Sequence, residues 1–333
     1  MKILFVHQGL QTFVKKDLDI LQEAHEVRSI EFKGNFAGLF SSLFHLWKGV
    51  VWCNLTFSWF GKLHAFFAVL FSKILRKRSM VIAGGDDIAC VPEIKYGIFC
   101  CWWKKWCPSF VFRFADLVIP VSRFNEKETL VNSKADPKKV RMIYHGFSSS
   151  LFKKITARKE NLVITIGSIC SDTKIKKGLQ LFVKAARLLP DTKFQLIGLD
   201  KDGTGEEFKR MSSKNVEFIG GVYGQELVEI CSRAKVYVQA SVHESFGCSL
   251  AEAMLCECIP VVSRNAAIPE VVGDAGFYLD ELTAEKLAEK VRCALAMPED
   301  FGRLARNRII EKFPLVKRRE ELLEIVRGLG GTK

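Results

Sequence analysis

Two carboxylates flank a short turn in the stretch HESFGCSLAE, residues 243–252, where Glu244 and Glu252 lie eight positions apart. The apolar run KVYVQAS comes directly before the turn, and Gly247 and Ser249 lie inside it. A strand that passes through a glycine turn into a helix leaves N–H groups and positive potential at the helix start, which suits a phosphate. Carboxylates beside such a turn can accept hydrogen bonds from ligand hydroxyl groups. The stretch therefore indicates a site for a ligand with both phosphate and hydroxyl groups.

The same stretch also has a purely structural interpretation. Ser249 is followed three residues later by Glu252, and this S-x-x-E pattern is the signature of a capping box at a helix start. A capping box uses both side chains to satisfy backbone N–H groups. Glu244 takes no part in such a cap, so it is the residue that capping leaves without a role. On this stretch alone both interpretations stay open.

The elements that must position these residues alternate along the chain. Short apolar runs alternate with longer amphipathic segments, in two series that meet near residues 148–161. Strand–helix alternation of this kind predicts two parallel sheets wrapped by helices. The predicted strands are residues 2–9, 25–32, 79–87, 115–122 and 140–147, then 161–168, 193–200, 216–221, 235–241, 259–265 and 275–280. The predicted helices are residues 123–133, 178–190, 206–213, 224–234, 249–256 and 313–331.

Glycine turns follow most of the predicted strands, beginning with Gly9 and ending with Gly247. Because ligands of doubly wound sheets bind beyond the carboxyl ends of the strands, these turns predict one cleft between two domains. No GxGxxG and no GxxxxGK[ST] pattern occurs, which argues against a nicotinamide dehydrogenase and a P-loop nucleotidase. The DKD sequence at Asp200–Asp202 is interpreted as turn chemistry rather than a metal site.

Charge and tryptophan are concentrated in the first half of the chain. The net charge is +13, and residues 1–150 hold 21 Lys and Arg against 12 Asp and Glu, a surplus of 9. All six tryptophans lie between Trp47 and Trp106. Tryptophan and basic residues together are typical of surfaces that meet an anionic membrane. The alternative is an ordinary basic surface over an aromatic core.

The lengths of the apolar stretches and the distribution of cysteines predict the membrane topology and the compartment. The apolar stretch of residues 36–60 is interrupted by His45, Lys48 and Asn54, and residues 63–75 are too short to cross a bilayer. We therefore expect no spanning helix. Eleven cysteines are scattered without a regular framework, and the chain opens with a strand pattern rather than a signal sequence. These features predict a cytoplasmic protein with reduced thiols, and the spacing around Cys100 does not fit a zinc site.

Further residues give the stretch around Glu244 a family context. Lys177 precedes Gly178 at a predicted helix start, and the tail PEVVGDAGFYLD covers residues 269–280. Residues 161–280 resemble the C-terminal domain of family 4 retaining glycosyltransferases, with the E-x7-E signature at Glu244 and Glu252. The N-terminal half resembles the family more weakly, through ADLVIPVSRF, YHGFSSSLF and GGDDI. The resemblance covers essentially the whole chain.

This resemblance implies the GT-B fold, in which two Rossmann-like α/β domains with doubly wound parallel sheets face a central cleft. Residues 1–153 would form an acceptor-binding domain and residues 154–311 a nucleotide-sugar-binding domain. Residues 312–333 would form a helix that crosses back to the first domain. A sugar-nucleotide epimerase with the same fold is an alternative enzyme.

The family's functional residues are carried over by position. Glu252 would hold the ribose, Lys177 would bind the diphosphate, and Glu244 would contact the donor sugar near the reacting carbon. From the first domain, Gly9 would line the diphosphate and Asp87 would approach the sugar or acceptor. The residues expected to present backbone amides to the sugar and phosphates are Phe246, Gly247, Cys248 and Ser249.

One departure from the family concerns the phosphate site. Ser168 stands where the family often has an arginine after the first strand of its second domain. An arginine provides a bidentate phosphate clamp that serine cannot provide. Either Lys174 or Lys176 compensates, or the diphosphate is bound more weakly. Ser168 also motivates the alternative of a catalytically inactive homologue that binds sugar or membrane.

The resemblance implies a hexosyltransferase that retains the anomeric configuration. It would move a sugar from a nucleotide-diphosphate sugar to a glycan acceptor, which the basic, tryptophan-rich first half suggests is lipid-linked or membrane-associated. No DxD ion site is recognised, so we expect no divalent metal and no other cofactor. Nucleic acid is not an expected partner, because no RNA- or DNA-binding motif occurs. The protein would be cytoplasmic, with peripheral attachment to the cytoplasmic membrane face.

Overall fold

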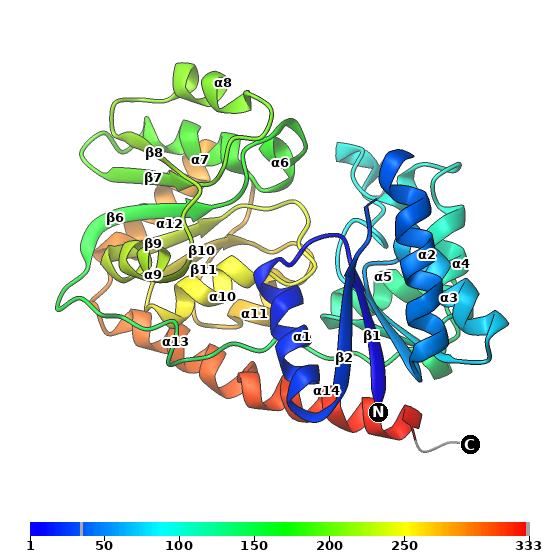
Figure 1. Cartoon of the computed structure of the whole chain (residues 1–333). Coiled ribbons are helices and arrows are strands. Elements are labelled where there is room, and N and C mark those ends of the chain that lie inside the picture. The colour runs from blue at the N-terminus through cyan, green and yellow to red at the C-terminus, as the bar shows by residue number, and fades with distance from the viewer. Residues whose placement is uncertain (34–35, 331–333) are drawn as a thin grey trace. The chain divides into compact units, whose positions relative to one another are not determined.

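The computed structural model describes residues 1–33 and 36–330. The chain divides into two compact units, the first formed by Met1–Gly146 and Leu315–Lys333 and the second by Phe147–Pro314. In Figure 1 the first unit runs from blue to cyan and includes the red C-terminal helix, and the second runs from green to orange. The sequence placed the corresponding boundaries at residues 153 and 311. The predicted cleft between two domains concerns how the units are arranged, and it stays a prediction.

The first unit is built on a parallel sheet with the strand order β2-β1-β3-β4-β5. Its strands are β1 (Lys2–His7), β2 (Glu26–Glu31), β3 (Leu55–Trp59), β4 (Arg78–Ala83) and β5 (Leu117–Pro120). Sequence reasoning missed β3, because it lies in the continuous apolar stretch 36–60 where periodicity cannot separate strand from helix. Asn54 marks the boundary, since its Oδ1 accepts a 2.9 Å hydrogen bond from the N–H of Lys2.

The predicted strand at residues 140–147 is wrong. This segment forms only isolated bridges, between Val118 and Val140 and between Phe147 and Pro314. The N–H groups of Arg141 and Ile143 donate to carbonyls of β5. It follows β5 for a few residues only, because the carbonyls of Ile143 and Tyr144 instead accept hydrogen bonds from Arg318. The sequence of this segment is typical of a strand. The buried guanidinium of Arg318, however, binds carbonyl groups that pairing with a second strand would need.

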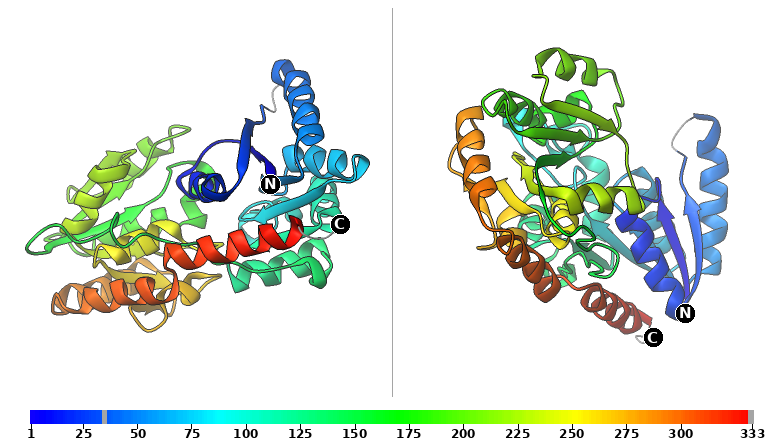
Figure 2. Two further views of the ribbon diagram at one scale, coloured as in Figure 1. Left: turned by 60° about the horizontal axis from the view of Figure 1, so that its bottom comes forward. Right: turned by 90° about the vertical axis from the view of Figure 1, so that its left-hand side faces the viewer.

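Helices cover both faces of this first sheet. They are α1 (Thr12–Ala24), α2 (Phe36–Trp52), α3 (Leu63–Ile74), α4 (Trp106–Phe114), α5 (Arg123–Ser133) and α14 (Leu315–Gly330), with short 3₁₀ turns at Pro92–Ile94, Ile98–Cys100 and Pro137–Lys139. Right-handed crossovers with this strand order place α1 on one face and α2, α3 and α4 together on the other. Figure 1 shows α2, α3 and α4 side by side. The C-terminal helix α14, red in Figure 2, packs against α1.

The second unit confirms the predicted strand–helix alternation. Its sheet has the order β11-β10-β9-β6-β7-β8, and all its strands are parallel. The strands are β6 (Glu160–Ile166), β7 (Lys193–Ile197), β8 (Val216–Gly220), β9 (Ala234–Gln239), β10 (Ile259–Ser263) and β11 (Phe277–Leu279). The helices are α6 (Ser171–Lys176), α7 (Leu179–Ala186), α8 (Thr204–Met211), α9 (Gly224–Arg233), α10 (Cys248–Leu255), α11 (Ile268–Val272), α12 (Ala284–Ala296) and α13 (Phe301–Lys312).

A buried ion pair joins α14 to the body of the first unit. The guanidinium of Arg318 donates two 2.7 Å hydrogen bonds to the carboxylate of Asp17 on α1, and both side chains are nearly inaccessible. The same guanidinium donates to the carbonyl of Tyr144 at 2.8 Å. Because every charged oxygen of Asp17 meets a donor, the pair tolerates its burial. The ion pair therefore fixes α14 to the first unit, whose other helices and strands all lie before residue 147 in the sequence.

We expect Arg318→Leu to destabilise the first unit by about 3–5 kcal/mol, because it leaves the charge of Asp17 buried without a partner. Urea unfolding followed by tryptophan fluorescence measures this unit, since all six tryptophans lie within it. Arg319→Ala is the matched control, because Arg319 pairs with Glu23 between the same two helices at an exposed position. It should cost less than about 1 kcal/mol. Equal losses in the two variants would contradict the role of the buried pair.

Candidate functional site

The turn that carries Lys177 lies directly against the segment that follows β9. Helix α6 ends at Lys176 with Lys177 as its C-cap, and Gly178 then adopts a left-handed backbone conformation with φ of 68° before α7 begins. A Cβ atom on Gly178 would lie 2.2 Å from the carbonyl oxygen of Ala240, so glycine is required for both conformation and space. The N–H of Val242 donates a 2.8 Å hydrogen bond to the carbonyl of Lys176. Two backbone contacts thus hold the Lys177 turn beside the start of the 243–252 stretch.

The side chain of Lys177 reaches across the end of β6 to Glu244. Its Cδ atom would lie 2.9 Å from a Cβ placed on Gly167, so its stem crosses the backbone just after β6. Its Nζ lies 3.6 Å from Oε1 of Glu244, and the two side chains are 24% and 15% exposed. The Oε1 atom of Glu244 is buried and has no hydrogen-bond partner among the described residues. The structure therefore brings these two predicted residues together, with an oxygen that remains able to accept a hydrogen bond.

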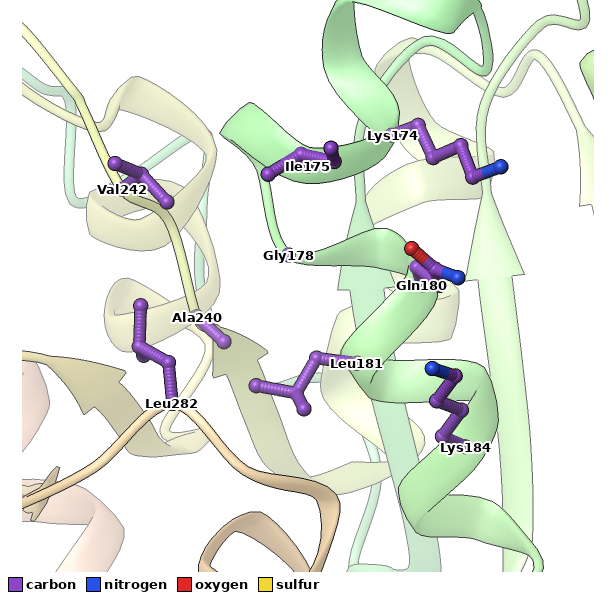
Figure 3. Close-up of a pocket in the computed structure, with 9 residues that line it drawn as sticks. All are labelled: Lys174, Ile175, Gly178, Gln180, Leu181, Lys184, Ala240, Val242 and Leu282. Atoms are coloured by element: carbon purple, nitrogen blue, oxygen red, sulfur yellow. The ribbon is translucent and has the colours of Figure 1, made fainter. Parts of the chain in front are cut away.

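A small pocket of about 220 Å³ backs this turn (Figure 3). Its apolar side is formed by Ile175, Leu181, Val242 and Leu282, which gather around Gly178, while Lys174 points away from them. Neither Lys177 nor Glu244 lines the pocket. The pocket thus belongs to the support behind the Lys177 turn rather than to the site itself.

Helix α10 begins differently from the capping-box prediction, which is wrong. The N-cap is Gly247, with φ of 100°, and Cys248 is the first helical residue. Ser249 is consequently the second residue of the helix, and its Oγ lies 3.0 Å from the hydroxyl of Tyr237. The first N–H groups of any α-helix have no intrahelical partner, and a glycine N-cap has no side chain that could bond to them. The helix start keeps the anion-binding character that the functional interpretation requires.

A buried polar network that the sequence reasoning missed connects β9 to α10. The hydroxyl of Tyr237 lies 3.0 Å from Gln239 Oε1 and from Ser249 Oγ. Burial raises the pKa of Tyr237, and the nearby charges of Glu244 and Glu252 raise it further. Both carboxylates of the E-x7-E motif therefore act on one hydroxyl. The alternation in KVYVQAS could have revealed the network, because Tyr237 and Gln239 lie on the same strand face.

The other predicted residues of the turn serve as anchors or lie at its rim. Phe246 is 2% exposed, and its ring stacks on Phe147 at 5.7 Å and meets Phe313 edge-on at 5.2 Å. Its side chain is a core anchor, which leaves only its backbone for a ligand. Cys248 is partly exposed at the first position of α10, and Glu252 is 9% exposed one turn further along.

Ser168, which stands where the family often has an arginine, and the neighbouring turn are also placed by the structure. Ser168 follows β6 and is partly exposed, and its carbonyl accepts a 2.6 Å hydrogen bond from Thr173 Oγ1. Lys174, expected as one possible replacement, is paired with Glu207 on α8. The carboxylate of Asp202 accepts hydrogen bonds from the N–H of Ser171 and from Thr204, and Asp200 accepts from the glycine amides that follow. Turn chemistry for the DKD sequence is thus confirmed.

Two predicted residues belong to the first unit. Gly9 follows β1, and its N–H donates a 3.0 Å hydrogen bond to Nδ1 of His7. Asp87 is fully buried, and its carboxylate accepts hydrogen bonds from the N–H groups of Gly61 and Gly85, each at 2.8 Å. The sequence placed Asp87 beside a ligand, whereas its neighbour Asp86 carries the partly exposed carboxylate. The carboxylate of Asp87 thus fixes the turns that contain Gly61 and Gly85. Any contribution of Asp87 to binding would come from the position of these two turns.

Comparisons with known proteins agree with this geometry. Residues 148–312 match the family described as glycosyl transferases group 1. The chain is 27% identical over 196 residues to a phosphatidylinositol N-acetylglucosaminyltransferase component from Arabidopsis thaliana, covering 56% of this chain and 43% of that protein. It is 27% identical over 255 residues to the alpha-maltose-1-phosphate synthase of Mycolicibacterium smegmatis, covering 67% of this chain and 66% of that protein. The chain thus spans less than two thirds of the length of these relatives.

Solved structures show the same fold over almost the full chain. Anabaena HepE, solved with UDP-glucose, has a TM-score of 0.79 at 16% identity, covering 98% of this chain and all of its own. Sucrose-phosphate synthase from Thermosynechococcus elongatus has a TM-score of 0.79 at 17% identity and covers both chains completely. At these identities the likeness concerns the fold, which is the predicted GT-B arrangement of two parallel-sheet α/β domains.

Asp87 makes the stability of the first unit depend on pH. Burial and then the charge of Asp86 raise the pKa of Asp87 to about 6, compared with about 3.9 for an unfolded chain. Between these values the carboxyl of Asp87 binds more protons in the folded state, so the contribution of Asp87 to stability falls as pH rises from about 4 to about 6, by at most about 3 kcal/mol. Asp87→Asn should lose this decline in urea midpoints followed by tryptophan fluorescence. Asp86→Asn should keep most of it, and an unchanged slope in Asp87→Asn would contradict the assignment.

Proposed function

Because the chain belongs to the group 1 glycosyltransferases, we propose that it transfers a sugar from a nucleotide-diphosphate sugar to a glycan acceptor. We further propose that transfer retains the anomeric configuration and needs no divalent cation. The observation that carries the proposal is the pairing of Lys177 with Glu244 beside the start of α10. A cation, a carboxylate and a helix start then converge on one place in the second unit.

The departing phosphate is the group that this arrangement stabilises best. When the bond between sugar and phosphate breaks, negative charge grows on the phosphate and positive charge grows at the anomeric carbon. The ammonium of Lys177 and the amides at the start of α10 are aimed at the negative charge. Because the donors are held by backbone contacts of Gly178 and Val242, they need little rearrangement during the reaction.

The two glutamates would contact different parts of the donor. Glu244 has a buried oxygen without a hydrogen-bond partner, 3.6 Å from the ammonium of Lys177, so it can accept a hydroxyl of the donor sugar and favour the cationic centre. Glu252 lies one turn into α10 and would accept the ribose hydroxyls. A retaining transfer then has the acceptor attack from the side of the leaving phosphate, whose oxygen takes the acceptor proton.

The charge that a metal ion often supplies to a diphosphate would come from the protein. Lys177 supplies one unit of positive charge, and the start of α10 adds a fraction of another. The carboxylates of Asp200 and Asp202 are engaged by backbone amides and Thr204, which fits a turn rather than ion ligation.

The acceptor side of the proposal concerns the first unit. One relative is named for phosphatidylinositol, a membrane lipid. Helix α2 exposes an apolar stripe one helical face wide, and α4 is preceded by exposed tryptophans. These side chains are Phe40, Phe44, Trp47 and Val51 on α2, and Trp102, Trp103 and Trp106 before and at the start of α4. Within residues 1–33 and 36–330, no helix is long and apolar enough to cross a bilayer.

The stripe and the tryptophans belong to one face of the first unit. Trp47 on α2 meets Phe71 on α3 at 5.1 Å, and Phe66 on α3 meets Trp106 at 5.2 Å. The Nζ of Lys48 lies 4.3 Å from the ring centroid of Phe44. Exposed aromatic rings with interleaved lysines suit the headgroup region of an anionic bilayer. We therefore propose that this α2–α3–α4 face rests on the cytoplasmic membrane surface, where a lipid-linked acceptor would be found.

Glu244→Gln and Lys177→Ala should each lower turnover of a nucleotide-sugar donor by about a hundredfold or more, because each removes a contact to charge in the transition state. The assay measures release of the nucleoside diphosphate in the presence of EDTA, in which the wild type should keep its rate. Lys209→Ala is the matched control, because that lysine pairs with Glu206 at an exposed position on α8 of the same unit. Near-normal turnover in either site variant, or complete loss in EDTA, would sink this mechanism.

The membrane proposal predicts flotation with vesicles that contain phosphatidylserine at low salt. The double variant Lys104→Glu with Lys105→Glu should weaken binding by about tenfold or more, since each basic residue near an anionic surface contributes about 1 kcal/mol. Trp102→Ser with Trp103→Ser should weaken it as well, through lost apolar contact. Leu188→Ser with Leu304→Ser removes exposed apolar side chains of the second unit and should bind normally. A wild type that does not float would refute the membrane surface.

A further inference from the structure

A buried carboxylate ties two neighbouring strand ends together in the first unit. Asp87 Oδ2 accepts the N–H of Gly61, directly after β3, and Oδ1 accepts the N–H of Gly85, directly after β4. Strands β3 and β4 pair with each other in the parallel sheet, so both turns lie at its carboxyl edge. This edge is where doubly wound sheets place ligands.

The first of these turns holds Phe60 in a strained backbone conformation. Phe60 has φ of 68°, which is unfavourable for a bulky side chain. Its N–H donates to the carbonyl of Ile82 at 3.0 Å, and its own carbonyl accepts from Lys62 at 2.9 Å. Among the described non-glycine residues, most others with positive φ follow helices or 3₁₀ turns, where this conformation is ordinary. Phe60 follows a strand, so the fold holds it there against its own preference.

The ring of Phe60 lies beside two charges of opposite sign. The ring of Phe60 is partly exposed and rests edge-on against buried Trp59 at 5.5 Å. The Nζ of Lys62 lies 5.6 Å from the centroid of this ring and 2.8 Å from Oδ2 of Asp86. The side chains of Lys62 and Asp86 are 31% and 39% exposed. An apolar ring, a donor and an acceptor thus lie within one small area.

We propose that Phe60, Lys62 and Asp86 form a binding subsite for a neutral sugar ring, and that this ring belongs to the acceptor. The C–H face of a pyranose is apolar and can pack on an aromatic ring, while its hydroxyls both donate and accept hydrogen bonds. Asp86 accepts from such hydroxyls and Lys62 donates to them. The assignment of the sugar as acceptor rests on the proposed function, and the presence of a sugar subsite does not.

Charge pairing selects a neutral ligand over an anion at this place. The ammonium of Lys62 lies 2.8 Å from the carboxylate of Asp86, within hydrogen-bond distance, whereas Lys177 and Glu244 are 3.6 Å apart. A phosphate at Lys62 would therefore have to displace a bonded carboxylate or approach it. A hydroxyl can be inserted beside the pair without separating the charges. Asp87 is here a positioning residue, because its oxygens are occupied by the amides of Gly61 and Gly85. Asp86 and Lys62 are the residues that touch the ligand.

The most informative substitution is Phe60→Gly, because it acts on the strained residue. Phe60→Gly removes the ring, and relief of the unfavourable φ offsets part of the packing that is lost against Trp59, so the protein should stay folded. A panel of methyl pyranosides (gluco, manno, galacto and N-acetylglucosamine) at millimolar concentration serves as the probe, with inorganic phosphate as the anionic comparison. Saturation-transfer NMR on the full chain without donor measures binding. We expect at least one pyranoside, and not phosphate, to bind the wild type.

The variants are expected to weaken that pyranoside by about tenfold or more, the effect of losing a central contact. They are Phe60→Gly, Asp86→Asn and Lys62→Met. Arg76→Gly is the matched control, since it relieves a positive φ of 53° after α3 and should leave binding unchanged. Binding that is equal in Phe60→Gly and wild type, or no pyranoside bound at all, would overturn the subsite.

The outcomes separate this inference from the proposed function. If the pyranoside binds through Phe60 but no nucleotide sugar is turned over, the transferase proposal fails and the sugar subsite stands. If donor turnover depends on Glu244 and Lys177 while Phe60→Gly leaves the acceptor KM unchanged, the transferase stands and the acceptor subsite fails.

Discussion

The contact on which the candidate site depends is the close approach of the Lys177–Gly178 turn to the backbone after β9. The carbonyl of Ala240 lies where a side chain of residue 178 would be, and Val242 donates to Lys176. These contacts leave no freedom between the two segments, so the distance between Lys177 and Glu244 is a property of the backbone. A long, flexible lysine side chain alone would have to lose its conformational entropy each time a ligand bound.

A common arrangement is visible in both units. Buried polar groups hold the turns, and their partly exposed neighbours offer chemistry to a ligand. Asp87 fixes two turns while Asp86 reaches the surface, and Tyr237 holds Ser249 while the neighbouring Cys248 is partly exposed. This division follows from solvation, because the fully buried carboxylate of Asp87 has its oxygens satisfied by protein amides, whereas the partly exposed carboxylate of Asp86 can accept hydrogen bonds from a ligand.

Much of this could be predicted from the sequence, and the failures have local causes. The strands of the second unit were predicted correctly because apolar periodicity is a local property. Motif spacing, which is also local, singled out Lys177 and the E-x7-E pair as candidate ligand-binding residues. The capping box failed because Ser249 has a buried tyrosine as its neighbour, which no local pattern records. GGDD does not say which of two adjacent carboxylates points inward, and only the structure shows that Asp87 is buried while Asp86 is partly exposed. Strand β3 was missed inside an unbroken apolar run.

The sequence by itself determined the alternation of strands and helices, the chemistry available at residues 243–252, and the concentration of charge and tryptophan in residues 1–150. These depend on residue type and spacing along the chain. Only the tertiary structure decided that Lys177 meets Glu244, that Asp17 is matched by Arg318, and that Phe60 is held against its backbone preference beside Asp86 and Lys62. Each of these pairs or groups joins segments that are remote in sequence, and their contact energies exist only after the strands between them have been aligned.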